Sequence, residues 1–171
     1  QVETSAGTFD YAKLIFALGA DPIRLPLAGN AADEVMSVND IADYARFRQR
    51  AADKKHVAII GAGLIGCEFA NDLANAGYKV TVIDPTAYPL SSLLPEAAGK
   101  QLLEPLQLIG VTFRFGVAVS AVDKNGTAYK LTLNNGETLN ADLVLSAVGL
   151  RPRTSLARET SLTVNRGIVV D

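Results

Sequence analysis

The stretch His56–Ala70, HVAIIGAGLIGCEFA, constrains the fold of this chain more than any other part of the sequence. It begins with the apolar run HVAII, which is typical of a strand buried inside a parallel sheet. Three glycines follow at G-x-G-x-x-G spacing, and an apolar segment then continues to a helix-ending Gly77. A second apolar run, Lys79–Asp84, comes next. This order predicts a strand–helix–strand unit with two parallel strands.

The three glycines predict a binding site for the phosphates of a dinucleotide. Gly61 permits a tight turn, Gly63 lets the backbone approach a pyrophosphate, and Gly66 lets the helix pack close to the strand. The helix N-terminus offers free N–H groups and the positive end of a dipole. A glycine-rich turn without a ligand is the alternative, and FAD, NAD, NADP and S-adenosylmethionine sites can share this turn. The candidate binding residues here are Gly61, Ala62, Gly63, Leu64, Ile65 and Gly66.

Asp84 narrows the choice of dinucleotide. It ends the second apolar run about 20 residues after the loop, where a carboxylate can accept hydrogen bonds from the adenosine ribose hydroxyls. The residues that follow, PTAYPLSS, include no Arg or Lys that could bind the 2′-phosphate of NADP. The sequence therefore favours NAD(H). The alternative is an exposed aspartate that opens a turn before Pro85.

Two chemically distinctive residues follow the last glycine on the predicted helix. The Glu68 carboxylate lies in the first turns of this helix, so it either interacts favourably with the helix dipole or points into the cofactor crevice. Its spacing alone does not separate these two roles. For Cys67 a small packed residue is favoured over a nucleophile, because no His or second Cys stands near it in sequence.

Before this unit, the run Tyr11–Gly19 predicts a strand, and the apolar spacing within residues 39–52 predicts a helix with Asn39 or Asp40 as its N-cap. After the unit, residues 95–110 predict a further helix that Pro105 either kinks or starts.

Two Asn-Gly pairs, at 125–126 and 135–136, are strong hairpin signals. They predict an antiparallel meander over roughly residues 117–140, followed by a last strand at Asp142–Val148. The predicted fold class is therefore α/β, with a Rossmann-like parallel sheet flanked by helices and a small antiparallel β-meander.

Composition excludes several other classes of function. The 171 residues carry a net charge of −2, so the chain has no excess of basic residues with which to bind nucleic acid. The longest apolar stretches are too short and too rich in glycine to span a membrane. A single Cys and a single His make a structural metal site implausible, and the lack of a disulfide framework predicts a reducing, cytoplasmic environment.

The stretches GAGLIGCEFANDL, VTVID and LVLSAVGLRPRT together resemble the pyridine nucleotide–disulfide oxidoreductase superfamily, in which an NAD domain is inserted into an FAD domain. Each domain of that family has a strand ending in A-x-G-x-x-P. ALGADP at 17–22 resembles the crossover out of the FAD domain, and AVGLRP at 147–152 resembles the return into it. The resemblance implies a stub of the FAD domain with the crossover at 1–36, an NAD(H)-binding domain at 37–150, and a return stub at 151–171.

The resemblance also implies roles for individual residues. The glycine loop would hold the NADH pyrophosphate, Asp84 the ribose, and Glu68 would lie near the junction of flavin and nicotinamide. No side chain is expected to act as an acid or base at the hydride step. Arg153 stands where the family usually has Asn, so the usual role of that position is not transferred. The remaining implied contacts are Ala147, Val148 and Gly149 on the nicotinamide side and Ala17, Leu18 and Gly19 on the FAD side.

Within this superfamily, GADPIRLP, DYARFRQ, GCEFANDL, SAVGLRPRT and VNRGIVVD resemble the rubredoxin–NAD(+) reductase branch. This implies a parent protein that passes electrons from NADH through FAD to rubredoxin or a related small iron protein. Flavorubredoxin and ferredoxin reductases are alternatives, and an NAD(H)-binding sensor without catalysis is a further one. Relative to the family, the FAD pyrophosphate loop, the carboxy-terminal G-D motif and the interface domain are missing. We therefore expect a fragment that binds NADH weakly, without FAD and without activity of its own.

Overall fold

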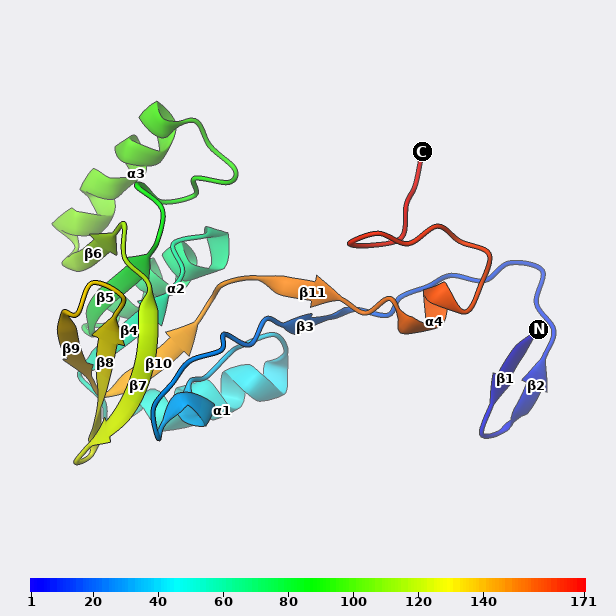
Figure 1. Ribbon diagram of the computed structural model, residues 1–171, viewed down its shortest axis with the longest axis horizontal. Helices are drawn as coiled ribbons and strands as arrows, with labels where there is room; N and C mark the ends of the chain where they lie inside the picture. Colours follow the sequence, from blue (N-terminus) through cyan, green and yellow to red (C-terminus); the bar gives the residue numbers. More distant parts are fainter. The chain divides into compact units, whose positions relative to one another are not determined.

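A computed structural model describes residues 1–171, which form two compact units. The larger unit, Pro22–Gly149, is built on a sheet of four parallel strands in the order β10-β4-β5-β6 (Figure 1). Because β4 is an interior strand with its sequence successor β5 on one side and β10 on the other, the order of connections reverses at β4. The strands are β4 (His56–Ile60), β5 (Lys79–Asp84), β6 (Val111–Phe115) and β10 (Leu143–Ser146).

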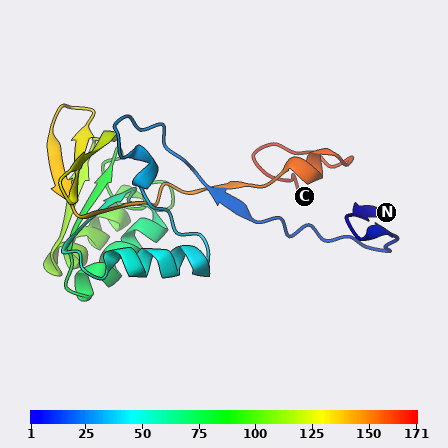
Figure 2. The same cartoon turned by 90° about the horizontal axis from the view of Figure 1, so that it is seen from below.

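Three helices cover one face of this sheet: α1 (Ile41–Ala51), α2 (Leu64–Asn75) and α3 (Glu96–Leu108). Strand residues of alternating position pack beneath them, as expected when successive side chains point to opposite faces. Figure 2 shows α1 below the sheet and the meander above it. The core on this face includes Phe47, Ala70, Leu106, Val57, Ile59, Val80, Val82, Leu143 and Leu145.

The antiparallel meander β7 (Val119–Asn125), β8 (Ala128–Leu133) and β9 (Thr138–Ala141) covers the other face. Its two turns lie where the Asn-Gly pairs predicted them: Gly126-Thr127 connects β7 to β8, and residues 134–137 connect β8 to β9. The second core lies between the two sheets and includes Ala58, Ile60, Ile83, Val144, Val122 and Leu131. The predicted α/β fold class is confirmed. The structure adds that the three helices of this unit pack on a single face, with the meander in place of a second helical layer.

The helix boundaries follow local chemistry. At the start of α1, the Asp40 carboxylate accepts a hydrogen bond of 2.7 Å from the Asp43 N–H, so Asp40 is the N-cap. At the end of α2, Gly77 adopts φ +88°, and the N–H of Tyr78 donates to the carbonyl of Leu73 at 3.0 Å. This is the pattern of a helix terminated by a left-handed glycine. Helix α3 contains Pro105 within its last turns and neither starts nor ends there.

The smaller unit consists of Gln1–Asp21 and Leu150–Asp171. The predicted strand at Tyr11–Gly19 is wrong, because these residues form no strand and Ile15 is 86% exposed. An apolar run becomes a strand only where a neighbour supplies backbone partners, and here pairing begins at Ala20. This part contains β1 (Val2–Thr4) paired with β2 (Gly7–Phe9), β11 (Leu150–Pro152) and α4 (Ser155–Arg158). Strand β11 pairs with β3 (Ala20–Pro22), whose last residue is the first of the larger unit.

Residues 22–36 pack with the sheet unit. Ala31 and Val35 are buried in the core on the meander face, next to the short 3₁₀ helix η1 (Ala32–Glu34). Met36 forms a parallel bridge to Leu145 of β10. The larger unit therefore begins before residue 37, the start predicted for the NAD(H)-binding domain. The assignment of both chain ends to an FAD domain stays a prediction.

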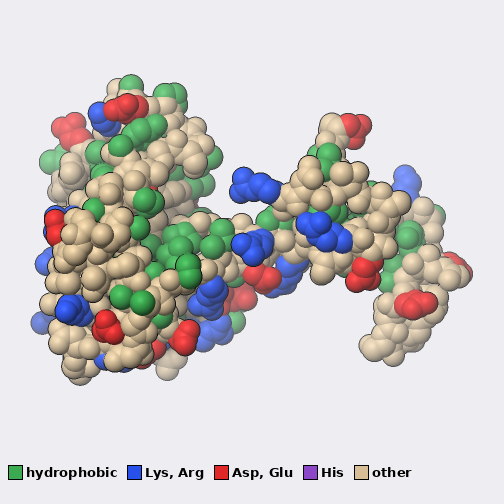
Figure 3. Space-filling view, viewed as in Figure 1, with side chains coloured by type: hydrophobic (Ala, Val, Ile, Leu, Met, Phe, Trp, Pro, Cys, Tyr) green, Lys and Arg blue, Asp and Glu red, His purple; other side chains and the backbone are tan.

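On the face shown in Figure 3, Lys and Arg side chains are mixed with Asp and Glu side chains. Neither sign of charge forms a continuous patch there. None of the helices combines the length and the apolar character needed to cross a bilayer.

Asp142 joins the starts of β10 and β4 and yields a prediction about stability. Its carboxylate accepts hydrogen bonds from the N–H groups of Lys55 (3.0 Å) and His56 (2.9 Å), which hold the pKa of Asp142 below its usual value. Hydrogen bonds to a charged group are worth more than neutral ones, so Asp142→Ala should lower the free energy of unfolding by about 2 kcal/mol at pH 7. Urea denaturation measures this change.

The pH dependence follows from the lowered pKa. A carboxylate of this kind stabilises the folded state fully above its unfolded pKa of about 3.9, and the contribution is lost as the pH falls through the lower folded pKa. The difference between the wild type and Asp142→Ala should therefore shrink below about pH 4. Asp53→Ala, which removes an exposed neighbouring carboxylate, is the matched control. Equal effects of the two substitutions would contradict the prediction.

Candidate functional site

The predicted phosphate loop lies where β4 ends, beside the end of β10. Gly61 adopts φ +108°, which favours glycine, and its N–H donates to the carbonyl of Ile83 at 2.8 Å. A Cβ at Gly61 would lie 2.7 Å from the carbonyl oxygen of Ala147. The first glycine is thus required both by its backbone conformation and by the close approach of the segment that follows β10.

The other two glycines differ in whether a contact within the chain requires the absence of a Cβ. A Cβ at Gly66 would overlap the carbonyl oxygen of Gly61, so Gly66 lets α2 pack directly on the end of β4. Gly63 has an ordinary φ of −74°, and a Cβ there would meet no atom within 4 Å. Nothing within the chain therefore requires glycine at position 63. The open space above it is a cradle that a Cβ would partly fill.

The N-terminus of α2 opens onto this space. Gly63 is its N-cap and supplies no side-chain cap, and the Cys67 N–H donates to the Gly63 carbonyl at 2.9 Å as the first hydrogen bond of the helix. The N–H groups of the first turn consequently lack intrahelical acceptors and lie at the positive end of the helix dipole. The arrangement fits the phosphates of a dinucleotide.

Asp84 faces the glycine loop from the end of β5. One carboxylate oxygen accepts a hydrogen bond of 2.7 Å from the Ala62 N–H. The other accepts from the Thr86 N–H at 2.8 Å and from the Thr86 hydroxyl. Asp84 therefore fixes the middle of the loop, a role that its position in the sequence did not suggest. Each oxygen has two lone pairs, so the carboxylate retains some capacity to accept further bonds.

The side chains of the first turns of α2 are unusually open to solvent. Leu64 and Ile65 are about half exposed although they are apolar, and Glu68 is exposed one turn further along. Cys67 is buried, and its Sγ donates to the carbonyl of Ala62 at 3.4 Å. Burial, with the nearby Asp84 and Glu68 carboxylates, raises the pKa of the Cys67 thiol to about 11. The interpretation of Cys67 as a packed residue is confirmed.

The remaining predicted residues lie in two different units. Ala147 and Val148 are half-buried and Gly149 is exposed, and the Ala147 N–H donates to the carbonyl of Ile60 at 2.8 Å. This bond brings the segment after β10 to the glycine loop. The residues predicted for the FAD side belong to the smaller unit, just before β3: Ala17, Leu18 and Gly19.

Ser146 was not anticipated from the sequence. It is the last residue of β10, immediately before Ala147, and its hydroxyl is buried without a hydrogen-bond partner. Its N–H donates to the carbonyl of Met36 at 2.7 Å. A buried hydroxyl left unpaired is uncommon, and it lies at the same carboxyl edge of the sheet as the glycine loop.

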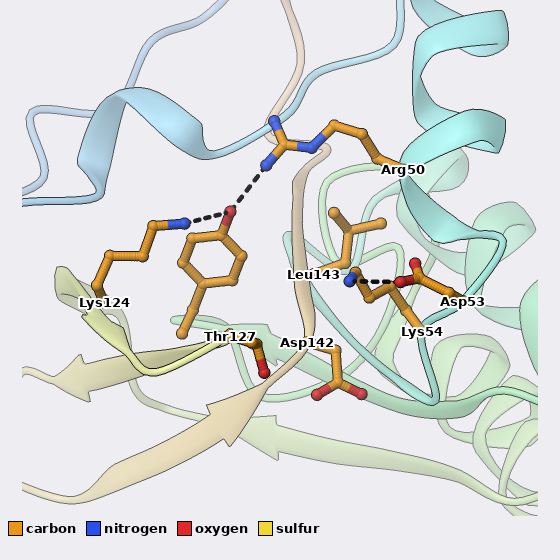
Figure 4. A pocket seen from close by; sticks show the side chains of 8 residues that line it. Arg50, Asp53, Lys54, Lys124, Thr127, Asp142 and Leu143 are labelled. Carbon is orange, nitrogen blue, oxygen red and sulfur yellow. Dashed lines mark hydrogen bonds and ion pairs between the residues drawn. The ribbon is translucent and has the colours of Figure 1, made fainter.

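A second concave region lies at the opposite edge of the sheet and differs chemically (Figure 4). This pocket of about 280 Å³ is lined by Arg50, Asp53, Lys54, Lys124, Thr127, Tyr129, Asp142 and Leu143. Its charges are paired: Lys124 lies 2.6 Å from Glu34, and Lys54 lies 3.1 Å from Asp53. Arg50 of α1 and Lys124 of the meander share the Glu34 carboxylate of η1, so most of the charge that lines this pocket is engaged within the chain.

Comparisons with known proteins agree with this geometry. The family model of the pyridine nucleotide-disulphide oxidoreductases matches residues 1–171. The chain is 50% identical over 163 residues to a rubredoxin-NAD(+) reductase of Alcanivorax borkumensis, covering 95% of this chain and 43% of that protein. It is 37% identical to a nitric oxide reductase FlRd-NAD(+) reductase of Aliivibrio fischeri, with the same coverage. The chain thus spans less than half the length of these relatives.

Among solved structures, a ferredoxin reductase from Rhodopseudomonas palustris superimposes with a TM-score of 0.88 at 30% sequence identity. The match covers 97% of this chain and 42% of that protein. Three findings agree: the glycine turn with its free helix terminus, the carboxylate at the end of β5, and the family match over all 171 residues. This chain belongs to the pyridine nucleotide-disulphide oxidoreductase family.

Proposed function

We propose that this chain is the NAD(H)-binding part of an FAD-dependent oxidoreductase that passes electrons from NADH through FAD to rubredoxin. The observation that carries the proposal is the open space over Gly63 at the N-terminus of α2. Gly61 and Gly66 are explained by contacts within the chain, whereas no such contact accounts for Gly63, as expected where a phosphate group approaches the loop.

The residues of the loop would hold the dinucleotide by its phosphates and its adenosine ribose. The first-turn N–H groups of α2 and the helix dipole would bind the pyrophosphate. Asp84 already accepts from the Ala62 N–H and from Thr86, and the lone pair that remains, on the oxygen bound by Ala62, would accept a hydrogen bond from a ribose hydroxyl. The same carboxylate disfavours a 2′-phosphate through like-charge repulsion.

At the other end of the site the chain would position the nicotinamide. The backbone of Ala147–Gly149 would border it, because this segment lies against Gly61. Leu64 and Ile65 would offer an apolar surface, and the exposed Glu68 would lie toward the junction with the flavin. When both cofactors are bound they supply the redox chemistry, and the protein contributes orientation. No side chain of this chain is assigned as an acid or base.

The identity of the acceptor is supported by the named relatives. Two rubredoxin-NAD(+) reductases, at 50% and 45% identity, favour rubredoxin, whereas the flavorubredoxin and ferredoxin reductases are less similar. All of these relatives are named as reductases, which favours an enzyme over a sensor. Adding NADH to the whole protein with rubredoxin, and separately with a disulfide substrate, tests the acceptor. Reduction of the disulfide alone would overturn this assignment.

Gly63→Ala tests the phosphate site. The added methyl meets no atom of the chain, so the free energy of unfolding should fall by no more than about 1 kcal/mol, the cost of alanine at a helix N-cap. It would occupy the space of the pyrophosphate, so the Kd for NADH should rise about tenfold or more. Calorimetric titration of the 171-residue chain with NADH, NADPH and FAD measures the affinities.

Gly167→Ala is the matched control, because a Cβ at this position also meets no atom within 4 Å and Gly167 is not one of the predicted binding residues. It should leave the Kd for NADH unchanged. If Gly63→Ala binds NADH as tightly as Gly167→Ala, the loop is not the phosphate site.

Asp84→Ser tests the choice of cofactor. Loss of the bond to the ribose should raise the Kd for NADH about tenfold, since a hydrogen bond to a charged group is lost. Removal of the negative charge should improve NADPH binding relative to NADH. Competitive titration of the two nucleotides measures this ratio. Equal weakening of both would mean that Asp84 acts only by holding Ala62.

A further inference from the structure

The connection between β5 and α3 returns to the phosphate loop at Leu90. The Leu90 N–H donates to the carbonyl of Ala62 at 2.8 Å, and the Ala62 N–H donates to Asp84 at 2.7 Å. The middle residue of the loop is thus held on both sides of its backbone. Both anchors come from the single segment that runs from Asp84 to Leu90.

Leu90 adopts an unusual conformation to make this bond. With φ +57° it is the only non-glycine residue of the chain in the left-handed region. A leucine pays a steric penalty there, so the surrounding structure must hold it in place. The side chain supplies that hold, because it is 9% exposed and packs in the core on the helix face of the sheet.

The residues next to Leu90 in the sequence also make contacts that hold this segment in place. The Leu90 carbonyl accepts hydrogen bonds from the N–H groups of Leu93 (2.8 Å) and Leu94 (2.9 Å). The preceding carbonyl, of Pro89, lies against Gly99 of α3, where a Cβ would lie only 2.7 Å away. The left-handed residue is therefore fixed between a turn and a helix.

We infer that Leu90 is a positioning residue for the dinucleotide: its buried side chain holds a strained backbone whose N–H fixes Ala62 and so preorganises the phosphate loop. This inference rests on the proposed function, since it assigns the loop to NADH. Leu90 does not touch the ligand in this account. It acts through the Ala62 carbonyl, at the opposite side of the residue from Asp84.

The test compares Leu90→Ala with Leu106→Ala in the 171-residue chain. Leu106 is a matched control, because it is 5% exposed and belongs to the same core, but it lies within α3, away from the hydrogen bonds that hold Ala62. Both substitutions should lower stability. Leu90→Ala should also raise the Kd for NADH about fivefold to tenfold, the loss expected for one hydrogen bond, whereas Leu106→Ala should leave it unchanged. Leu90→Met, which keeps the buried anchor, should restore wild-type affinity.

Hydrogen exchange of the glycine-loop amides in the ligand-free protein supplies a second readout. Leu90→Ala should speed this exchange relative to Leu106→Ala. If Leu90→Ala does not fold, Gly99→Ala displaces the same segment from behind and should give the same two effects. Equal NADH affinity and equal loop exchange in the Leu90 and Leu106 variants would overturn the inference. A wild-type chain that fails to bind NADH would overturn the proposed function, and loop exchange would then decide alone whether Leu90 holds the loop.

Discussion

The close approach of α2 to the end of β4 is the constraint on which the rest of the site depends. Gly66 has no Cβ to separate the helix from the carbonyl of Gly61, so the helix begins directly above the carboxyl edge of the sheet. This places the free N–H groups of the first turn at the point where the strand order reverses, between β4 and β10. Open α/β sheets bind ligands at such a point. A larger residue at position 66 would move the helix and its dipole away from that edge of the sheet.

The loop between β4 and α2 is held by contacts within the chain at Gly61 and Ala62, but it has open space next to Gly63. Gly61 is pressed against Ala147, and Ala62 is bonded to both Asp84 and Leu90. Gly63, by contrast, faces empty space. A loop held at several backbone atoms needs little reordering when it accepts a ligand, and such preorganisation reduces the entropic cost of binding. The carboxylate of Asp84 combines two tasks, since it shapes the loop and faces the proposed ribose position.

Much of this architecture could be predicted from local sequence patterns. The glycine spacing, the buried runs at β4 and β5, and the Asn-Gly turns each encode a local conformation, and each was found where the pattern placed it. The run at Tyr11–Gly19 misled because apolar character does not specify a pairing partner. The bonds from Asp84 and Leu90 to Ala62, and the packing of the three helices α1–α3 on one face, depend on tertiary contacts. No single-sequence pattern records them.

The position of β10 has a consequence for how the chain acquires its structure. This strand pairs in parallel with β4, yet Asp142, which bonds to the backbone of Lys55 and His56, stands 87 and 86 positions later in the sequence. Pairings between distant residues raise the contact order and slow folding, because a long loop must close before they form. During synthesis the first three parallel strands can assemble early, but one edge of β4 stays unsatisfied until the meander has emerged. The strand whose carboxyl end lies beside the glycine loop is therefore the last strand of the parallel sheet to be made, so the proposed nucleotide site is completed only after the rest of that sheet is available.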